Sequence, residues 1–158
     1  MEVRLLIALT LIAAAAVTSA QELLPNRDVF VRSGAPPGGD GTRYKPYSSI
    51  QEMVEKHDAV WGQVFLHPGV YEEDVDIHRG RFWFMPAQQY DVIIKGSMTI
   101  RRPGIYIRGL DFQSEGTPII LAEGATGCQI QQNRIISVGE GQAAIDLRAQ
   151  NCADCLIS

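Results

Sequence analysis

A basic segment in the middle of the chain holds the strongest candidate binding residues. Between His78 and Arg108 there are six lysines or arginines and one acid, Asp91, so this segment carries +5 in a chain of net charge −4. An arginine guanidinium can bind a carboxylate or a sulfate through two parallel hydrogen bonds. A lysine or arginine could also supply the base or the cation that proton abstraction from a uronic acid requires. The alternative is that these are ordinary outward-facing charges.

Aromatic residues in the same segment could stack on sugar rings. In the run Arg-Phe-Trp-Phe-Met that begins at Arg81, side chains alternate between the faces of a strand, so either Trp83 or the pair Phe82 and Phe84 must point into the core. Core packing of Trp83 is the commoner arrangement, whereas a surface Trp83 near Arg81 would contact carbohydrate. The candidate substrate-binding residues are therefore Arg81, Trp83, Lys95, Arg101 and Arg108. We assign no catalytic residue.

The acidic run 72–76 is a weaker candidate for metal chemistry. Its carboxylates could gather calcium, which prefers carboxylate oxygens, but their spacing matches no calcium loop. A solvated strand edge is the preferred interpretation. We therefore predict no metal site and leave calcium open as a cofactor.

The three cysteines also allow more than one interpretation. Cys152 and Cys155 have the spacing of a zinc or redox half-site, but zinc would need two further ligands and the histidines lie far earlier in the chain. Cys128 and Cys155 occupy equivalent places of a repeat, so we expect core thiols stacked on neighbouring coils. A disulfide between Cys128 and Cys155 is the alternative.

Short strands must position these residues. The 15 glycines and 8 prolines predict many tight turns, and apolar runs too short for helices recur along the chain. The expected strands are residues 28–32, 63–66, 74–77, 81–85, 92–95, 98–100, 105–107, 118–121 and 144–147. Residues 33–46 should form an extended loop. One helix should begin at Ser49, which has capping-box spacing to Glu52, and should end near residues 57–58.

The second half of the chain repeats itself at intervals of 23 to 27 residues. Residues 107–112 align with 130–135 at an offset of 23, and residues 118–121 align with 144–147 at an offset of 26. Strands and turns repeating at such a period predict a parallel solenoid, because a single coil cannot bury its own apolar face.

A third copy of the repeat begins at 154–157, where Asp154 lies 27 residues after Gly127. Strand alternation predicts that the inward side chains of the repeats are Ile105, Ile107, Leu110, Phe112, Cys128, Ile130 and Ile135. Asn133 stands where Leu110 stands one coil earlier. We interpret Asn133 as a corner residue, because asparagine tolerates left-handed backbone and can hydrogen-bond peptide groups of neighbouring coils.

Several motifs resemble the start of a right-handed parallel β-helix of the pectin-lyase-like family. They are residues 40–42 (DGT), 45–47 (KPY), 49–52 (SIQE), 67–71 (HPGVY), Glu73, 92–96 and 105–112. The resemblance covers roughly residues 29–157. It implies an all-β fold, a right-handed parallel β-helix solenoid whose open end is covered by a short N-terminal capping helix.

The resemblance leaves the activity open, because the family includes lyases, pectin esterases, polygalacturonases and noncatalytic adhesion proteins. No aspartate pair follows residues 118–121, which argues against the esterases and polygalacturonases. The expected function is binding of an acidic polysaccharide. Cleavage by β-elimination would be added if coils beyond Ser158 carry a catalytic site, since the chain stops inside a repeat and resembles an N-terminal part. The alternative is a noncatalytic surface or adhesion scaffold.

Residues 1–20 predict a secretory signal peptide followed by one β-helix domain at 21–158. Arg4 precedes a 13-residue apolar stretch, and small residues at 18–20 offer a cleavage site. This stretch is too short to span a bilayer core, and no later stretch is long enough. The expected location is therefore secreted or periplasmic, without a membrane span. The negative net charge argues against a nucleic-acid partner.

Overall fold

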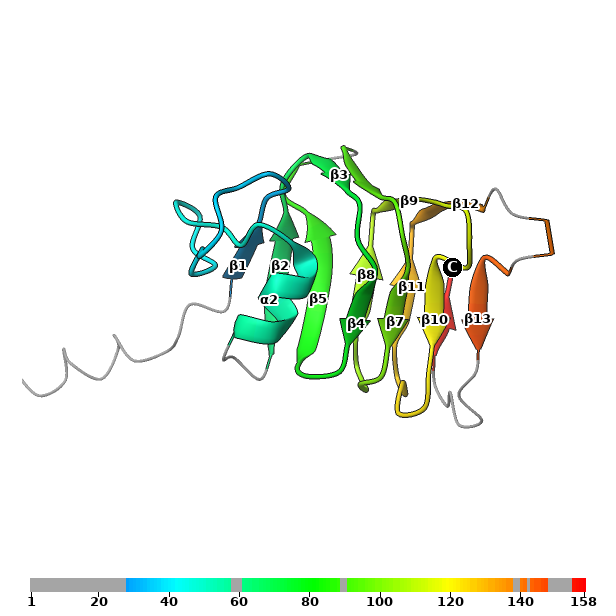
Figure 1. Ribbon diagram of the computed structural model, residues 1–158. Coiled ribbons are helices and arrows are strands. Elements are labelled where there is room, and N and C mark those ends of the chain that lie inside the picture. The colour runs from blue at the N-terminus through cyan, green and yellow to red at the C-terminus, as the bar shows by residue number, and fades with distance from the viewer. Residues whose placement is uncertain (1–27, 58–60, 89–90, 138–139, 142, 148–154) are drawn as a thin grey trace, which may run out of the picture.

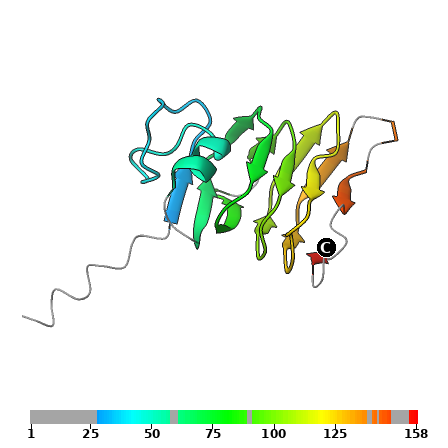
Figure 2. The same cartoon turned by 60° about the horizontal axis from the view of Figure 1, so that its bottom comes forward.

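The protein is a parallel β-solenoid in which short strands stack coil upon coil. The computed structural model describes residues 28–57, 61–88, 91–137, 140–141, 143–147 and 155–158. Four successive coils each contribute one strand to each of three sheets, and all strand pairings among the described residues are parallel. Figures 1 and 2 show the stack running from β1 at one end to the C-terminus at the other. The predicted all-β solenoid is confirmed.

The three sheets form the sides of the stack. The six-stranded sheet contains, in spatial order, β1 (Asp28–Val31), β2 (Trp61–Leu66), β5 (Arg81–Pro86), β8 (Tyr106–Arg108), β11 (Gln129–Gln131) and β14 (Leu156–Ile157). One four-stranded sheet contains β3 (Gly69–Tyr71), β6 (Val92–Ile94), β9 (Asp111–Ser114) and β12 (Arg134–Ser137). The other contains β4 (Val75–Ile77), β7 (Met98–Ile100), β10 (Ile119–Leu121) and β13 (Ile145–Leu147).

The register between strands reproduces each repeat offset found in the sequence. Ile107 pairs with Ile130 at the offset of 23, and Ile119 pairs with Ile145 at the offset of 26. Gln129 pairs with Leu156, which carries the offset of 27 into the third copy. The aligned residues are therefore neighbours on successive coils.

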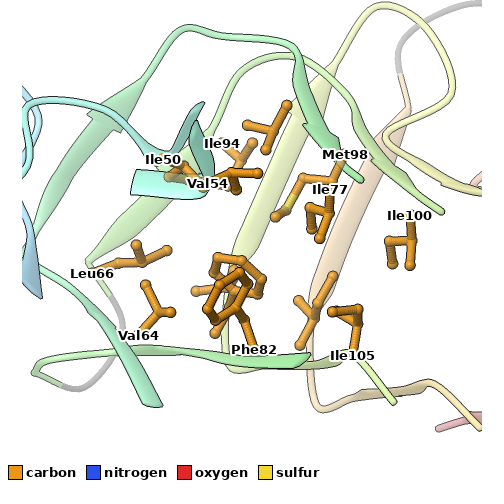
Figure 3. Close-up of a cluster of buried hydrophobic side chains, with 14 of the residues drawn as sticks. Ile50, Val54, Val64, Leu66, Ile77, Phe82, Ile94, Met98, Ile100 and Ile105 are labelled. Atoms are coloured by element: carbon orange, nitrogen blue, oxygen red, sulfur yellow. The ribbon is translucent and has the colours of Figure 1, made fainter. Parts of the chain in front are cut away.

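The core is a continuous column of apolar side chains inside the three sheets. Figure 3 shows side chains of the helix and of several strands meeting in this interior, among them Ile77, Phe82 and Ile100. The predicted inward residues are confirmed: Ile105, Ile107, Leu110, Phe112, Cys128 and Ile130 are buried, and Ile135 is partly buried against the core. On β5 the buried pair is Phe82 and Phe84, so the expectation that Trp83 packs in the core is wrong.

A short helix, α2 (Ile50–Lys56), lies at the β1 end of the stack and packs beside β4 (Figure 1). As predicted, Ser49 is the N-cap, and its side chain accepts a hydrogen bond from the Glu52 amide at 3.0 Å. Ile50, Met53 and Val54 form its buried face. The helix ends at the predicted place, because the last backbone bond runs from the His57 amide to the Met53 carbonyl.

The acid of the capping box departs from the expected pattern. Glu52 accepts hydrogen bonds from the backbone amide and the hydroxyl of Ser48, at 2.9 and 2.6 Å, instead of from the N-cap amide. Glu73, which follows β3, takes over part of the capping. Its two carboxylate oxygens accept from the Ile50 and Gln51 amides at 2.8 and 3.0 Å. One carboxylate therefore joins the first full coil to the helix.

The loop at 33–46 returns along the outer edge of β1. The Phe30 amide donates to the Gly41 carbonyl, the Tyr47 amide donates to the Phe30 carbonyl, and the Arg32 amide donates to the Tyr47 carbonyl. Unpaired strand edges invite pairing with other chains, so this loop protects the β1 end of the six-stranded sheet.

The Asn133 corner is confirmed in its hydrogen bonds and corrected in its backbone. The Asn133 side-chain oxygen accepts from the Leu110 amide at 3.0 Å, and its side-chain nitrogen donates to the Ile107 carbonyl at 2.9 Å. The left-handed residue is its neighbour Gln132, with φ +54°, at the place that Gly109 fills with φ +72° one coil earlier.

Cys128 and Cys155 lie on neighbouring coils and contact the core, but they differ in chemistry. Cys128 is fully buried and free, and burial raises the pKa of its thiol. Cys155 packs against the core and is disulfide-bonded. A disulfide joining Cys128 to Cys155 is therefore excluded.

Some of the sequence predictions fall outside the described residues. These include the signal peptide at 1–20 and the first cysteine of the Cys152–Cys155 motif. In the described part of the chain, no helix combines the length and the apolar character that crossing a bilayer requires.

Candidate functional site

An open groove of about 440 Å³ lies on the outward face of the six-stranded sheet. Outward residues recur at every second position of each strand, so neighbouring coils present them side by side. The lining residues come from four successive strands and the turns before two of them: Gln63, Trp83, Met85, Gly104, Ile105, Tyr106, Arg108, Gly127 and Gln129.

Four of these residues form one row across the sheet. Gln63 pairs with Trp83, Trp83 with Tyr106, and Tyr106 with Gln129, so the row crosses β2, β5, β8 and β11 in register. Trp83 is 50% exposed, and its ring centroid lies 6.0 Å from that of Tyr106. Two adjacent aromatic rings with an amide side chain on either side therefore form the middle of the groove.

Arginines flank this row on both sides. Arg81 stands two residues before Trp83 on β5, and a Cβ added to Gly104 would lie 3.8 Å from the Cδ of Arg81. The Arg81 side chain therefore extends over the turn that leads into the next coil. Arg108 stands two residues after Tyr106 on β8, and its Nε donates to the Gln132 side-chain oxygen at 2.8 Å.

Glycines keep the groove open where the chain turns into β8 and β11. Gly104 and Gly127 occupy equivalent turns 23 residues apart, with φ of +69° and +59°. Residues with a side chain rarely adopt this left-handed backbone, so glycine occupies both positions. The groove therefore reaches the backbone at both places.

The ion pairs among the described residues leave these two arginines out. They join Lys56 to Glu52, Lys95 to Glu72, Arg101 to Asp76, and Arg134 to Asp111. Within the described residues, the guanidinium groups of Arg81 and Arg108 therefore keep their charges without a carboxylate partner. Such charges attract an anionic ligand more strongly than paired ones do.

The structure separates the five candidate residues into two groups. Arg81, Trp83 and Arg108 share the outward face of the six-stranded sheet. Lys95 follows β6 on another side of the stack and pairs with Glu72 at 3.2 Å. Arg101 follows β7 on the third side and contacts Asp76 at 3.0 Å. A single ligand on the groove face does not reach these last two residues.

Three residues of the row were not among the sequence candidates: Gln63, Tyr106 and Gln129. The repeat itself contains the signal that would have found Tyr106 and Gln129. Once Trp83 is assigned to the outward face, adding the repeat offset leads from Trp83 to Tyr106, which pairs with it, and then to Gln129.

The acidic run at 72–76 is more than a solvated edge, because each of its carboxylates has a partner. Besides the two ion pairs above and the Glu73 cap, the Asp74 side chain accepts from the Ser97 amide and hydroxyl, both at 2.8 Å. Together these contacts join neighbouring coils. In the part of the chain that is described, no cluster of three or more histidine, cysteine or acidic side chains could hold a metal ion.

Comparisons with family models, with curated proteins and with solved structures give no match to this chain. The assignment of function therefore depends on the groove and on the motifs of the sequence.

Proposed function

We propose that this protein binds an acidic polysaccharide in the groove of the six-stranded sheet. The observation that supports this most directly is the combination of Trp83 and Tyr106, 6.0 Å apart, with Arg81 and Arg108 on the same face. Aromatic side chains offer rigid apolar surfaces on which the C–H faces of pyranose rings can pack. Arginine pairs with carboxylates through two donors, and the Nη fork of Arg108 is separate from the Nε that Gln132 already holds.

The polar ends of the aromatic row fit the same class of ligand. Gln63 and Gln129 each carry an amide that can both donate and accept, as sugar hydroxyl groups require. The groove is open and polar at its margins, as a site for a long, hydrated chain must be. A small apolar ligand would be held by a more enclosed cavity.

We also propose that the solenoid is right-handed and belongs to the pectin-lyase-like class. Parallel strands joined through crossovers are right-handed in nearly all proteins. The motifs at 40–52 and 67–73, the capping helix and the Asn133 corner support the same assignment. Location outside the cytoplasm remains part of the proposal, supported by the signal-like segment and by the disulfide-bonded Cys155.

Cleavage by β-elimination would require a base to remove a proton from the uronate ring. A guanidinium donates hydrogen bonds and accepts none, so Arg108 could stabilise the resulting enolate but could not act as that base. Tyr106 is the other ionisable side chain among the described residues that line the groove. We therefore propose that the groove binds the polymer. Whether the protein also cleaves it is tested by the absorbance assay below.

The test is calorimetric titration of the purified protein with polymannuronate, polygalacturonate and chondroitin sulfate, with a neutral glucan as the control polymer. We expect an acidic polymer to bind and the neutral one to bind at least tenfold more weakly. Trp83→Ala should weaken binding about 3- to 10-fold, and Arg108→Ala about 10-fold or more. Lys95→Ala removes the same charge on another side and should change affinity less than twofold.

The proposal would be wrong if no acidic polymer binds, or if Lys95→Ala weakens binding as much as Arg108→Ala. The same samples, followed for the absorbance of unsaturated uronates, separate the two classes of function. Binding with a rise in absorbance indicates a lyase. Binding without one indicates a noncatalytic polysaccharide-binding scaffold.

A further inference from the structure

We infer that the groove selects a flat, linear polyuronate whose successive carboxylates point to opposite edges of the chain, which is the geometry of a β-1,4-linked polymer. This inference rests on the proposed polysaccharide binding and adds the linkage class to it. It depends on where the aromatic row and the two arginines lie relative to the solenoid axis.

The long direction of the groove follows the axis of the solenoid. Its central row takes one residue from each of four successive coils, Gln63, Trp83, Tyr106 and Gln129, all in register. Neighbouring strands lie about 4.8 Å apart, so the row advances by that distance for each coil. This step is close to the length of one pyranose unit in an extended chain. A linear polymer along the axis would therefore meet a new residue of the row at each sugar.

The two arginines lie on opposite sides of this row and on adjacent coils. Trp83 and Tyr106 face each other across the β5–β8 pair. Arg81 lies two residues before Trp83, and Arg108 lies two residues after Tyr106. At about 3.3 Å per residue the two backbone positions are about 13 Å apart along the strands, with the aromatic rings midway. Each arginine therefore stands at its own edge of the row.

The arginine contacts preserve this staggered arrangement. Arg81 extends from β5 over Gly104, toward the coil of β8. Arg108 extends from β8 to Gln132, toward the coil of β11. Because both side chains lean in the same direction along the axis, they stay about one coil apart. Two consecutive sugar units would thus present one carboxylate to each edge.

Polymer stereochemistry decides which chains can meet this requirement. A β-1,4 linkage between equatorial positions turns each ring over relative to the last, so side groups alternate between the edges of a flat ribbon. An axial linkage, as in α-1,4-galacturonan, winds the chain and distributes its carboxylates around a helix. The rings of Trp83 and Tyr106 are tilted by 57° to each other, so they meet successive sugars at different angles. A wound chain cannot follow this row while it offers successive carboxylates to Arg81 and Arg108.

The experiment compares hexamers of β-1,4-linked mannuronate and α-1,4-linked galacturonate, with the neutral β-1,4-linked glucose hexamer as a control. We expect the mannuronate hexamer to bind at least tenfold more tightly than either of the others. Arg81→Ala and Arg108→Ala should each weaken mannuronate binding about tenfold, as expected for a lost charge-assisted hydrogen bond. The matched variant Lys95→Ala should stay within twofold. Circular dichroism spectra of all variants verify that they are folded.

Distinct outcomes overturn the inference and the proposal on which it rests. Equal or tighter binding of the galacturonate hexamer, or sensitivity to only one of the two arginines, overturns the alternating ribbon and leaves polysaccharide binding intact. Failure of both acidic hexamers to bind, or equal binding of the glucose hexamer, overturns the proposed function as well.

Discussion

Glu52 joins three segments of the N-terminal region through one carboxylate. It accepts from Lys56 at 2.6 Å, from Ser48, and from the Gly38 amide at 3.3 Å. These hydrogen bonds, that from Lys56 foremost, lower the pKa of Glu52 from 4.5 to about 2. The charged form is therefore favoured in the folded protein. Its contribution to stability is complete above about pH 4.5 and is lost as the pH falls toward 2.

We predict that Glu52→Gln lowers the free energy of unfolding by about 1–2 kcal/mol at pH 7, because charge-assisted hydrogen bonds become neutral ones. Urea denaturation at pH 7 and again near pH 2 measures the effect. The gap between wild type and variant should narrow at the lower pH. Glu55→Gln on the same helix, whose carboxylate is exposed, should cost less than about 0.5 kcal/mol. A gap that is constant with pH would contradict the role of the charge.

Gln132 carries backbone strain that its counterpart Gly109 avoids. A non-glycine residue in left-handed backbone costs about 1–2 kcal/mol, and glycine recovers part of this at some entropic cost in the unfolded chain. We predict that Gln132→Gly raises the free energy of unfolding by about 0.5–1 kcal/mol, measured by urea denaturation. Gln131→Gly, within strand β11, should lower it by about 1 kcal/mol. Equal effects of the two substitutions would show that the positive φ is not the cause.

At the scale of the coil, the Asn133 side chain joins two neighbouring coils through two hydrogen bonds. Asn133→Ala would leave the Leu110 amide and the Ile107 carbonyl without their side-chain partner. We expect a loss of about 2–3 kcal/mol in the free energy of unfolding, because both groups are partly buried. Gln129→Ala, in strand β11 of the same coil and on the surface, should cost less than about 0.5 kcal/mol. Similar losses of unfolding free energy for the two variants would contradict the role of Asn133 in joining the two coils.

Strand β5 allows a direct test of alternation between its two faces. Phe84 is fully buried and Trp83 is half exposed. We predict that Phe84→Ala lowers the free energy of unfolding by about 3–5 kcal/mol and Trp83→Ala by less than about 1 kcal/mol. Thermal and urea unfolding measure both. A large loss for Trp83→Ala would place its ring in the core and would undermine its use as a binding residue.

The strands were predictable wherever an apolar run alternated clearly, and less so elsewhere. β3 was not predicted as a strand, because it has three residues, begins with glycine and buries only Tyr71. In the core, the hydroxyl of Tyr71 donates to the His67 and Val31 carbonyls. Burial raises the pKa of this hydroxyl to about 12. Only pairing with β6 makes this segment a strand. The pairing partner is a tertiary fact, so local pattern could not supply it.

Across the whole molecule, the continuous core makes Cys128 a reporter of global opening. The thiol is fully buried, and burial raises its pKa, so both access and thiolate formation are suppressed in the folded state. We predict slow labelling by a thiol reagent in native buffer and fast labelling in concentrated urea, without reductant. Mass spectrometry of the labelled peptides identifies the site. Labelling of folded Cys128 at the rate of a free model thiol would contradict the burial of this residue.

The sequence by itself determined the period, the inward residues and the helix, because these depend on local chemistry repeated along the chain. An offset of 23 aligns Ile107 with Ile130 whatever the direction of the coils in space, and a serine three residues before a glutamate favours a helix start. Only the tertiary structure decided which basic residues share a surface. Arg81 and Arg108 lie on the outward face of one sheet, while Lys95 and Arg101 lie on other sides and pair with acids. Position around a coil depends on where each turn falls, and a shift of one residue moves a side chain from the core to the surface.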